Sequence, residues 1–263
     1  MRLTAKAIFD KKQKGEKITA LTAYDYPTAR ILDESGLDMI LVGDSLGMVL
    51  LGYDTTLPVT MRDMLHHTKA VARAVKNAMV IADMPFGAYD RAEQALKNAR
   101  RFLKEGGADG VKLEGGFRIQ EQIQALIAAG IPVMGHLGMT PQSASQLGGY
   151  RVQGKEKGQA DKIVKDAVLL AHLGVFALVL ECIPTALANQ VTQKIQCPTI
   201  GIGAGPGTDG QILVLHDMLG FVGKVGPKFV RRYAALETEI RKAASTYRED
   251  VLKGRFPAKQ ESF

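Results

Sequence analysis

The sequence predicts an α/β fold, a (β/α)8 TIM barrel, formed by a single catalytic domain that spans residues 1–263. Short apolar, β-prone runs alternate with helical patterns along the chain, and such alternation is typical of parallel strands with right-handed crossovers. The length of 263 residues is long for an ordinary domain and normal for one barrel. An open doubly wound sheet shares the pattern. However, polar residues follow many of the strands here, and an open sheet would supply them only near its switch point.

Seven strands can be read in order, and most of them end on an acidic or otherwise reactive residue followed by glycine, proline or serine. They are KITALTAY (17–24), DMILVGDS (38–45), MVIADMPFG (79–87), DGVKLEGG (109–116), IPVMGHLG (131–138), ALVLECIP (177–184) and TIGIGAG (199–205). An eighth strand is expected near residues 211–215 or 221–225. In a barrel, the carboxyl ends of all strands meet on the face that holds the active site.

The helices between the strands carry their own start and stop signals. Thr60 with Asp63 opens one helix, and the D-x-x-E pattern of Asp90 and Glu93 opens another that ends at Gly106 and Gly107. Further helices are predicted at residues 27–36, 118–129, 159–173, 184–195 and 233–253. The one long connection, residues 138–158, is rich in glycine and polar residues, which predicts a functional loop over a site.

Composition narrows the class of protein. The hydrophobic content of 46% and the charged content of 23% are those of a globular protein with a sizeable core. No run approaches the roughly 18 apolar residues of a membrane helix, and the N-terminus lacks the apolar region of a signal peptide. We therefore expect no membrane association and a cytoplasmic location. The net charge of +7 is spread over helix surfaces without aromatic interleaving, so we expect no nucleic-acid partner.

The two cysteines, Cys182 and Cys197, show no metal-type spacing. We expect both to be buried thiols in a reducing compartment.

Asp44 and Asp83 each follow an apolar run and precede a tight turn. Two hard oxygen ligands without a cluster of cysteine and histidine suit Mg²⁺, which takes one or two carboxylates and leaves its other positions to water and substrate. Alternatively, Asp44 caps its turn and Asp83 pairs with a lysine. Glu114 arrives from the next strand, and the three acids together favour the metal site.

Lys112 and Glu114 are two residues apart, so both side chains leave the same face of their strand. A lysine that faces a barrel interior needs a charged partner, which Glu114 supplies. The pair is then either structural or functional. In the functional interpretation, Lys112 stabilises negative charge on a substrate and Glu114 supports the metal. A Schiff base on Lys112 is a further alternative.

Three other strand-end residues are candidates for the site. Glu181 ends a very apolar run, where partial burial would suit a general base near neutral pH, although it could instead cap the helix that begins at Pro184. His136 is expected to lie among the strand ends and to hold a neighbouring group. Ser45 has no histidine partner in sequence, and a hydrogen bond to a bound anion suits it better than nucleophilic catalysis.

The segment 205–210 matches G-x-G-x-x-G but lacks the context of a dinucleotide site, so we interpret it as a turn.

The motifs together resemble the ketopantoate hydroxymethyltransferase family from about residue 3 to Phe263. The motifs that carry the resemblance are VGDSLGMVLLGYDTTLPVT (42–60), ADMPFGAY (82–89), VKLEGG (111–116), GHLGMTPQS (135–143), GGYRVQGK (148–155), LECIP (180–184) and GIGAGPGTDGQILVLHD (201–217). Their number and order are highly specific. The matches near 223–228 and in the tail FPAKQESF are looser.

The resemblance implies a (β/α)8 barrel that forms a homo-oligomer, typically a decamer. It also implies transfer of a hydroxymethyl group from 5,10-methylenetetrahydrofolate to 3-methyl-2-oxobutanoate, with Mg²⁺, to give 2-dehydropantoate in pantothenate and coenzyme A biosynthesis. Six residues receive roles by this resemblance: Asp44, Asp83 and Glu114 at the metal, Asp44, Ser45, Asp83 and Lys112 at the keto acid, and Glu181 as proton acceptor.

Two other interpretations remain open at this point. One is an Mg²⁺-dependent 2-oxo-acid lyase or mutase of the phosphoenolpyruvate mutase and isocitrate lyase type, which usually carries a catalytic cysteine in a K-[KR]-C-G-H loop. That loop is absent from this sequence. The other is a non-enzymatic barrel that serves as a binding or assembly module, which predicts neither a metal requirement nor proton exchange.

Overall fold

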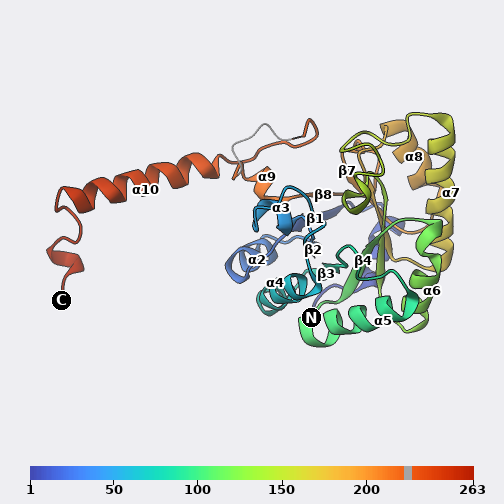
Figure 1. Ribbon diagram of the computed structural model, residues 1–263, viewed down its shortest axis with the longest axis horizontal. Helices are drawn as coiled ribbons and strands as arrows, with labels where there is room; N and C mark the ends of the chain where they lie inside the picture. Colours follow the sequence, from blue (N-terminus) through green and yellow to red (C-terminus); the bar gives the residue numbers. More distant parts are fainter. Residues whose placement is uncertain (222–226) are drawn as a thin grey trace. The chain divides into compact units, whose positions relative to one another are not determined.

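A computed structural model describes residues 1–221 and 227–263, which divide into two compact units, Met1–Val214 and Leu215–Phe263. The first unit contains all eight strands, which form a closed parallel barrel in the order of the sequence. The strands lie at its centre with helices outside them (Figure 1). The predicted closed barrel is therefore confirmed, whereas the single catalytic domain over residues 1–263 stays a prediction.

All seven predicted strands are present, each shorter than the apolar run that predicted it. The strands are β1 Ile18–Thr22, β2 Met39–Val42, β3 Met79–Asp83, β4 Gly110–Glu114, β5 Val133–Gly138, β6 Ala177–Glu181, β7 Thr199–Ile202 and β8 Gly210–Leu213. The eighth strand thus overlaps the first of the two predicted positions. The other position, residues 221–225, lies almost entirely outside the described residues.

Burial explains why the strands read as continuous apolar runs. Every residue of β2, β3 and β4 is buried, because one face of each strand points into the barrel and the other meets the surrounding helices. In β1 and β8, which pair with each other to close the barrel, buried positions alternate with more exposed ones. The closing strands therefore carry the weakest sequence signal.

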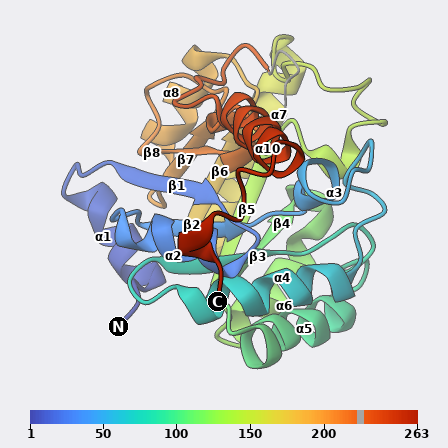
Figure 2. The same cartoon turned by 90° about the vertical axis from the view of Figure 1, so that its left-hand side faces the viewer.

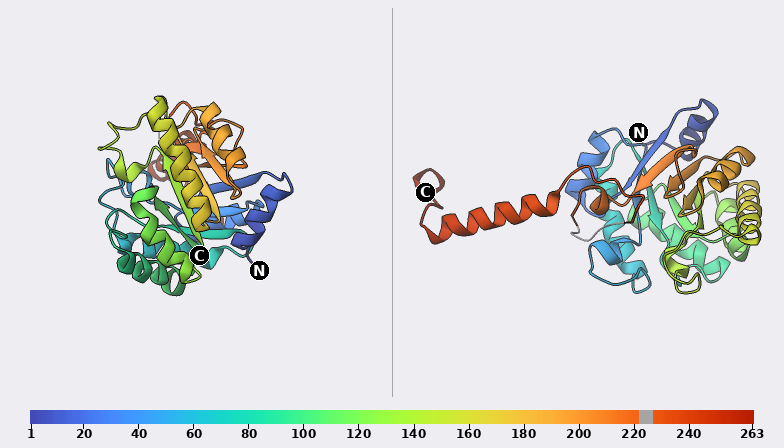
Figure 3. Two further views of the ribbon diagram at one scale, coloured as in Figure 1. Left: turned by 90° about the vertical axis from the view of Figure 1, so that its right-hand side faces the viewer. Right: turned by 90° about the horizontal axis from the view of Figure 1, so that it is seen from above.

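Helices surround the barrel. They are α1 Ala5–Gln13, α2 Tyr26–Glu34, α3 Leu46–Val49, α4 Met61–Ala74, α5 Ala92–Arg101, α6 Gln120–Ala128, α7 Lys157–Leu173 and α8 Thr185–Lys194. The α4, α5 and α6 helices lie along one side of the barrel (Figure 2), and α7 runs beside α6 (Figure 3). Figure 3 also shows that these helices keep to the outer face of the strands.

The two predicted helix starts have different outcomes. Thr60 and Asp63 form the expected capping box at the start of α4, with each side chain bonded to the other residue's backbone amide. The predicted cap at Asp90 is wrong, because α5 begins at Ala92 and Arg91 is the residue before it. The Gln94 side chain reaches back instead, accepts from the Asp90 amide and donates to the Gly87 carbonyl, so the turn before α5 is stabilised by a glutamine.

The amino-terminal ends of the strands carry a repeated arrangement of charges. In three places an aspartate just before one strand accepts a hydrogen bond from a backbone amide of the preceding strand and pairs with a basic residue near the N-terminus. The three sets are Asp38 with Thr19 and Lys11, Asp109 with Val80 and Arg2, and Asp209 with Thr199 and Lys12. These charges thus connect the N-terminal segment to the end of the barrel opposite the strand-end acids.

The segment with the G-x-G-x-x-G pattern joins β7 to β8, as the predicted turn requires. A strand, and not a helix, follows it. A Cβ atom on Gly207 would lie 1.7 Å from Oδ1 of Asn189 in α8, so a side chain at that position would require Asn189 to move. Glycine at this position therefore allows the turn to pack closely against α8.

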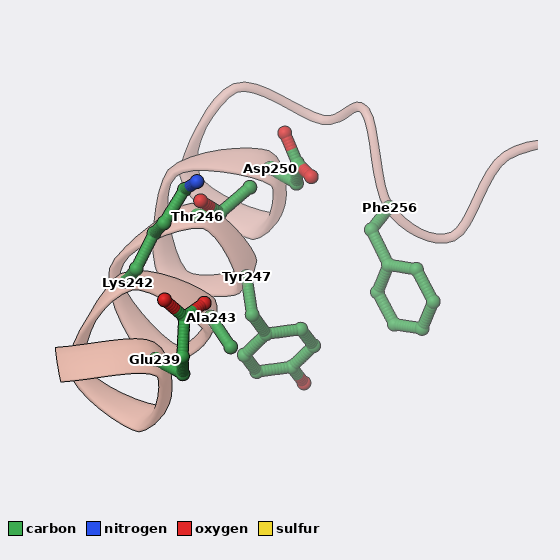
Figure 4. Close-up of a pocket in the computed structure, with 7 residues that line it drawn as sticks. All are labelled: Glu239, Lys242, Ala243, Thr246, Tyr247, Asp250 and Phe256. Carbon is green, nitrogen blue, oxygen red and sulfur yellow. The ribbon is translucent and has the colours of Figure 1, made fainter. Parts of the chain in front are cut away.

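The second unit contains α9 Leu215–Met218, α10 Leu236–Leu252 and a short 3-10 helix, Lys259–Glu261. A shallow hollow lies between α10 and the chain that follows it, where the Tyr247 and Phe256 rings are 5.5 Å apart (Figure 4). None of the predicted site residues belongs to this unit. Among the described residues, no helix is both long and apolar enough to cross a membrane.

Candidate active site

The strand-end residues come together where the carboxyl ends of β2 to β6 meet. Asp83, Glu114 and Glu181 are the last residues of β3, β4 and β6, and Asp44 lies two residues beyond β2. The register of the parallel strands places Asp83 beside Lys112 and Glu114 beside His136. The structure thus places these predicted residues in a single cluster, while their chemical roles stay predictions.

Lys112 lies at the centre of the acidic residues. Its Nζ is 2.8 Å from both carboxylate oxygens of Asp83 and 3.7 Å from Oε1 of Glu114. The backbone amide of Asp44 donates to Oδ2 of Asp83 at 3.4 Å. These four residues are all buried, with exposed fractions between 1% and 6%. Lys112 therefore joins carboxylates from two neighbouring strands in a site with little solvent.

His136 lies between two acids and is 2% exposed. Its Nδ1 is 3.3 Å from Oε1 of Glu114, and its Nε2 is 3.2 Å from Oε2 of Glu181. Both distances are in the range of ion pairs, although neither contact is aligned as a hydrogen bond. Burial and the charge of Lys112 oppose protonation, but the contacts with Glu114 and Glu181 outweigh them and raise the pKa of His136 to about 9.

The acids of the cluster differ in electrostatic environment. Burial, together with the charges of Asp83 and Glu114, raises the pKa of Asp44 well above its ordinary value. Burial also raises the pKa of Asp83, although Lys112 opposes the rise. In Glu114 burial has the same tendency, yet His136 and Lys112 bring its pKa below the ordinary value. Asp44 is thus the acid whose charge the protein stabilises least.

Lys112 remains charged in spite of its burial. Burial alone would lower the pKa of its ammonium group, but Asp83, Glu114 and Asp44 together raise it above the ordinary value. A lysine held in its charged form by three carboxylates is poorly suited to form a Schiff base, which requires a neutral amine. The arrangement favours an electrostatic role over an imine.

The donor set fits a magnesium ion. Asp44 provides a buried carboxylate whose pKa is raised, Asp83 shares its carboxylate with Lys112, and Oε1 of Glu114 is buried without a hydrogen-bond partner. Within the described part of the chain, no three histidine, cysteine, aspartate or glutamate side chains form a complete metal site. Magnesium commonly binds through one or two carboxylates and fills its other positions with water and substrate, so the donor set is compatible with this ion.

Ser45 lies at the edge of the same site, directly after Asp44. Its hydroxyl group is 2.9 Å from the hydroxyl of Tyr24, which is 1% exposed. This contact holds the Ser45 side chain beside the predicted metal ligand. The neighbouring tyrosine was not among the predicted site residues.

The backbone on both sides of Glu181 is held closely. Its carbonyl accepts from the Met139 amide at 2.9 Å, and a Cβ atom on Gly138 would lie 2.2 Å from the same oxygen. Cys182 follows in the left-handed region with a φ of 48°. Such strain is found where surrounding contacts impose the conformation. Here these contacts fix the backbone at the end of β6, where Glu181 lies.

The two cysteines differ in burial. Cys197 is buried as expected, whereas Cys182 is only partly buried because it lies beside the site after β6. Burial and the charge of Glu181 raise the pKa of the Cys182 thiol to about 12. At neutral pH this thiol is therefore protonated and a poor nucleophile.

The long connection predicted at residues 138–158 is a loop of residues 139–156 that contacts the strand-end residues, and its functional role stays a prediction. The Tyr150 hydroxyl is 3.5 Å from Sδ of Met48, and the Gln153 amide donates to the Cys182 carbonyl at 2.8 Å. Gln142, in the short 3-10 helix Pro141–Ser143, reaches the acids themselves and bonds to Asp44 and Glu114. Gln142 belongs to the motif GHLGMTPQS, but no spacing rule singles it out.

Known proteins resemble this chain over nearly its whole length. The model of the family described as ketopantoate hydroxymethyltransferase matches residues 2–259. A protein named 3-methyl-2-oxobutanoate hydroxymethyltransferase from Syntrophus aciditrophicus is 55% identical over 100% of this chain and 97% of its own. One of the same name from Thermoanaerobacter sp. (strain X514) is 59% identical over 96% of this chain and 92% of its own.

Among solved structures, a phosphoenolpyruvate phosphomutase from Streptomyces platensis subsp. rosaceus has a similar fold, with a TM-score of 0.64 and 15% identity over 96% of this chain and 88% of that one. At this identity the likeness concerns the fold alone. The family model and the curated relatives, in contrast, cover nearly the whole chain. The chain therefore belongs to the ketopantoate hydroxymethyltransferase family.

Proposed function

We propose that this chain is a 3-methyl-2-oxobutanoate hydroxymethyltransferase that acts in pantothenate and coenzyme A biosynthesis. The observation that carries the proposal is the buried chain of charges Asp83–Lys112–Glu114–His136–Glu181, which ends on a partly exposed carboxylate. The relatives named for this activity, which match over 97% and 92% of their own length, support it. In the proposed reaction, C3 of the keto acid loses a proton and forms a bond to the methylene carbon of 5,10-methylenetetrahydrofolate. Water supplies the hydroxyl group, and tetrahydrofolate leaves.

Asp44 and Asp83 would hold Mg²⁺, with Glu114 beside them. When bound, the metal would act as a Lewis acid that polarises the keto group and makes the C3 proton easier to remove. Lys112 contributes fixed positive charge where negative charge develops on the keto acid, in a buried site where such charge is effective. Ser45, held by Tyr24, would donate a hydrogen bond to the substrate carboxylate.

Glu181 is the proposed proton acceptor. Its side chain is 14% exposed, the most of the site acids, so a substrate can reach it. His136 contacts Glu181 with one ring nitrogen and Glu114 with the other, and thereby holds the carboxylate of Glu181 in place. This arrangement positions the base at the open end of the cluster.

The proposal predicts exchange of the C3 proton without folate. In D₂O with Mg²⁺, the wild-type protein should remove the C3 proton signal of 3-methyl-2-oxobutanoate in an NMR time course. Glu181→Gln should slow the exchange at least ~100-fold, because general-base catalysis contributes on that scale. Glu121→Gln, an equal change at an exposed position of α6, should exchange at the wild-type rate. If Glu181→Gln matches this control, Glu181 is not the base.

The lyase and mutase alternative is less well supported. Neither cysteine lies in a K-[KR]-C-G-H loop, and the raised pKa of Cys182 keeps its thiol protonated. When 5,10-methylenetetrahydrofolate is added to the same NMR experiment, a transferase should convert 3-methyl-2-oxobutanoate to 2-dehydropantoate, whereas a lyase or mutase should form no such product. Proton exchange without formation of 2-dehydropantoate would count against the transferase.

The assembly is proposed from the family resemblance as a homo-oligomer, with a decamer as the expected form and the cytoplasm as its location. Native mass spectrometry of the full chain should give ten times the mass of the 28.4 kDa subunit. A mass equal to one subunit at micromolar concentration would contradict the oligomer, and a smaller multiple would contradict the decamer alone.

A further inference from the structure

Gln142 forms four hydrogen bonds within the site, three through its side chain and one through its backbone amide. Its side chain is 5% exposed and lies between the strand ends and the loop after β5. From its contacts we infer that Gln142 is a positioning residue, which holds the Asp44 carboxylate for the metal and couples it to Glu114. The inference rests on the proposed function, since it concerns the same metal site.

Every polar atom of the Gln142 amide group has a partner. Nε2 donates to Oδ2 of Asp44 at 2.8 Å and to the Met84 carbonyl at 2.8 Å, and Oε1 accepts from the Tyr89 hydroxyl at 2.6 Å. The Met84 carbonyl can only accept, so the NH₂ group must face it and Asp44. The orientation of the amide group is therefore set by its partners.

The backbone of the same residue reaches a second acid. The Gln142 amide N–H donates to Oε2 of Glu114 at 3.0 Å. One residue of the loop thus contacts carboxylates that come from β2 and β4, which are not adjacent strands. The loop can take this path only while both acids lie in their present positions.

Tyr89 orients the amide group from the other side. The Tyr89 hydroxyl donates to Oε1 of Gln142 at 2.6 Å and lies 3.5 Å from the Glu114 carbonyl oxygen. Tyr89 therefore acts on Asp44 through Gln142, because its own hydroxyl group bonds to the amide oxygen.

Loss of the Gln142 side chain would remove the 2.8 Å hydrogen bond that holds Oδ2 of Asp44. The carboxylate would be free to rotate, and a metal ion would have to order it on binding. Removal of partners that orient metal ligands typically lowers metal affinity 10–100-fold. The effect should appear in metal binding itself, before any substrate is added.

The test measures Mn²⁺ binding to the full-length protein by electron paramagnetic resonance, without substrates. Gln142→Leu should raise the Kd for Mn²⁺ by about 10–100-fold. Gln146→Leu, the same change at an exposed position of the same loop, should leave the Kd unchanged. Equal affinities in the two variants overturn the inference, and so does a wild-type chain that binds no Mn²⁺.

Tyr89→Phe provides a second, milder variant in case Gln142→Leu folds poorly. It removes only the hydroxyl group that orients the amide, so the Kd should rise in the same direction by a smaller factor. The double variant should bind no more weakly than Gln142→Leu alone, because both residues act through one contact. Additive losses overturn the coupling. Failure of C3 exchange with normal Mn²⁺ binding would instead count against the proposed reaction.

Discussion

Asp33 shows how one buried carboxylate can connect two elements of the barrel. It lies near the end of α2, is 4% exposed and accepts hydrogen bonds from the backbone amides of Lys76, Asn77 and Ala78, just before β3. Asp33→Ala would leave these amides unpaired. We therefore expect the free energy of unfolding, measured in urea, to fall by about 2–4 kcal/mol. Asp161→Ala, at an exposed position of α7, should change stability by less than about 0.5 kcal/mol.

The same residue has a defined pH dependence. Burial would raise the pKa of Asp33, but the amide groups of Ala78, Lys76 and Asn77 outweigh it and lower the pKa below its ordinary value. Its stabilising effect is therefore complete above the unfolded pKa of about 3.9 and is lost as the pH falls through the lower folded pKa. The stability difference between wild type and Asp33→Ala should shrink below about pH 4. A constant difference down to pH 2 would contradict this account.

At the scale of single residues, the position of the acids could be predicted and their environment could not. Asp83, Glu114 and Glu181 end apolar strands, and parallel strands bring their carboxyl ends to one face, so their convergence followed from sequence. Gln142 and Tyr89 lie in loops, which have no periodicity. Their contacts depend on the path of the loop in three dimensions, so no local pattern revealed them.

At the scale of elements, a local sequence signal predicted one helix start correctly, at α4, and failed at another, at α5. Thr60 and Asp63 form the expected capping box at the start of α4. Asp90 does not cap α5, and the Gln94 side chain accepts from its backbone amide, as the Glu93 side chain would in a capping box. A sequence pattern shows which residues can cap a helix, whereas tertiary packing decides which of them does.

The N-terminal helix illustrates a different limit at this scale. The α1 helix was not predicted, because its sequence AKAIFDKKQ carries many charges and only Ile8 is buried. The structure shows that Lys12 donates to the carbonyls of Thr192, Ile195 and Cys197 and pairs with Asp209. Such partners lie some 180 residues away in sequence, so the charges appeared as an ordinary solvated surface.

At the scale of the whole molecule, closure of the barrel depends on the pairing of β1 with β8. Ile18 lies opposite Gly210 at the start of this pairing. A Cβ atom on Gly210 would lie 2.4 Å from the Ile18 carbonyl oxygen and 2.9 Å from Cδ1 of Ile200. These contacts involve β1 and β7, the strands on both sides of β8, so the crowding cannot be relieved by one side chain alone. Glycine at this position therefore favours closure of the barrel.

Gly210→Ala should accordingly weaken the whole barrel. We expect it to lower the free energy of unfolding in urea by about 2–3 kcal/mol, the usual scale of overpacking in a rigid interior. Gly158→Ala is the matched control, because Gly158 lies in α7 with no atom within 4 Å of an added Cβ. It should leave stability unchanged or raise it by up to about 1 kcal/mol, as expected for a better helix former. If the two variants unfold at the same urea concentration, close packing between β1 and β8 does not limit the stability of the closed barrel.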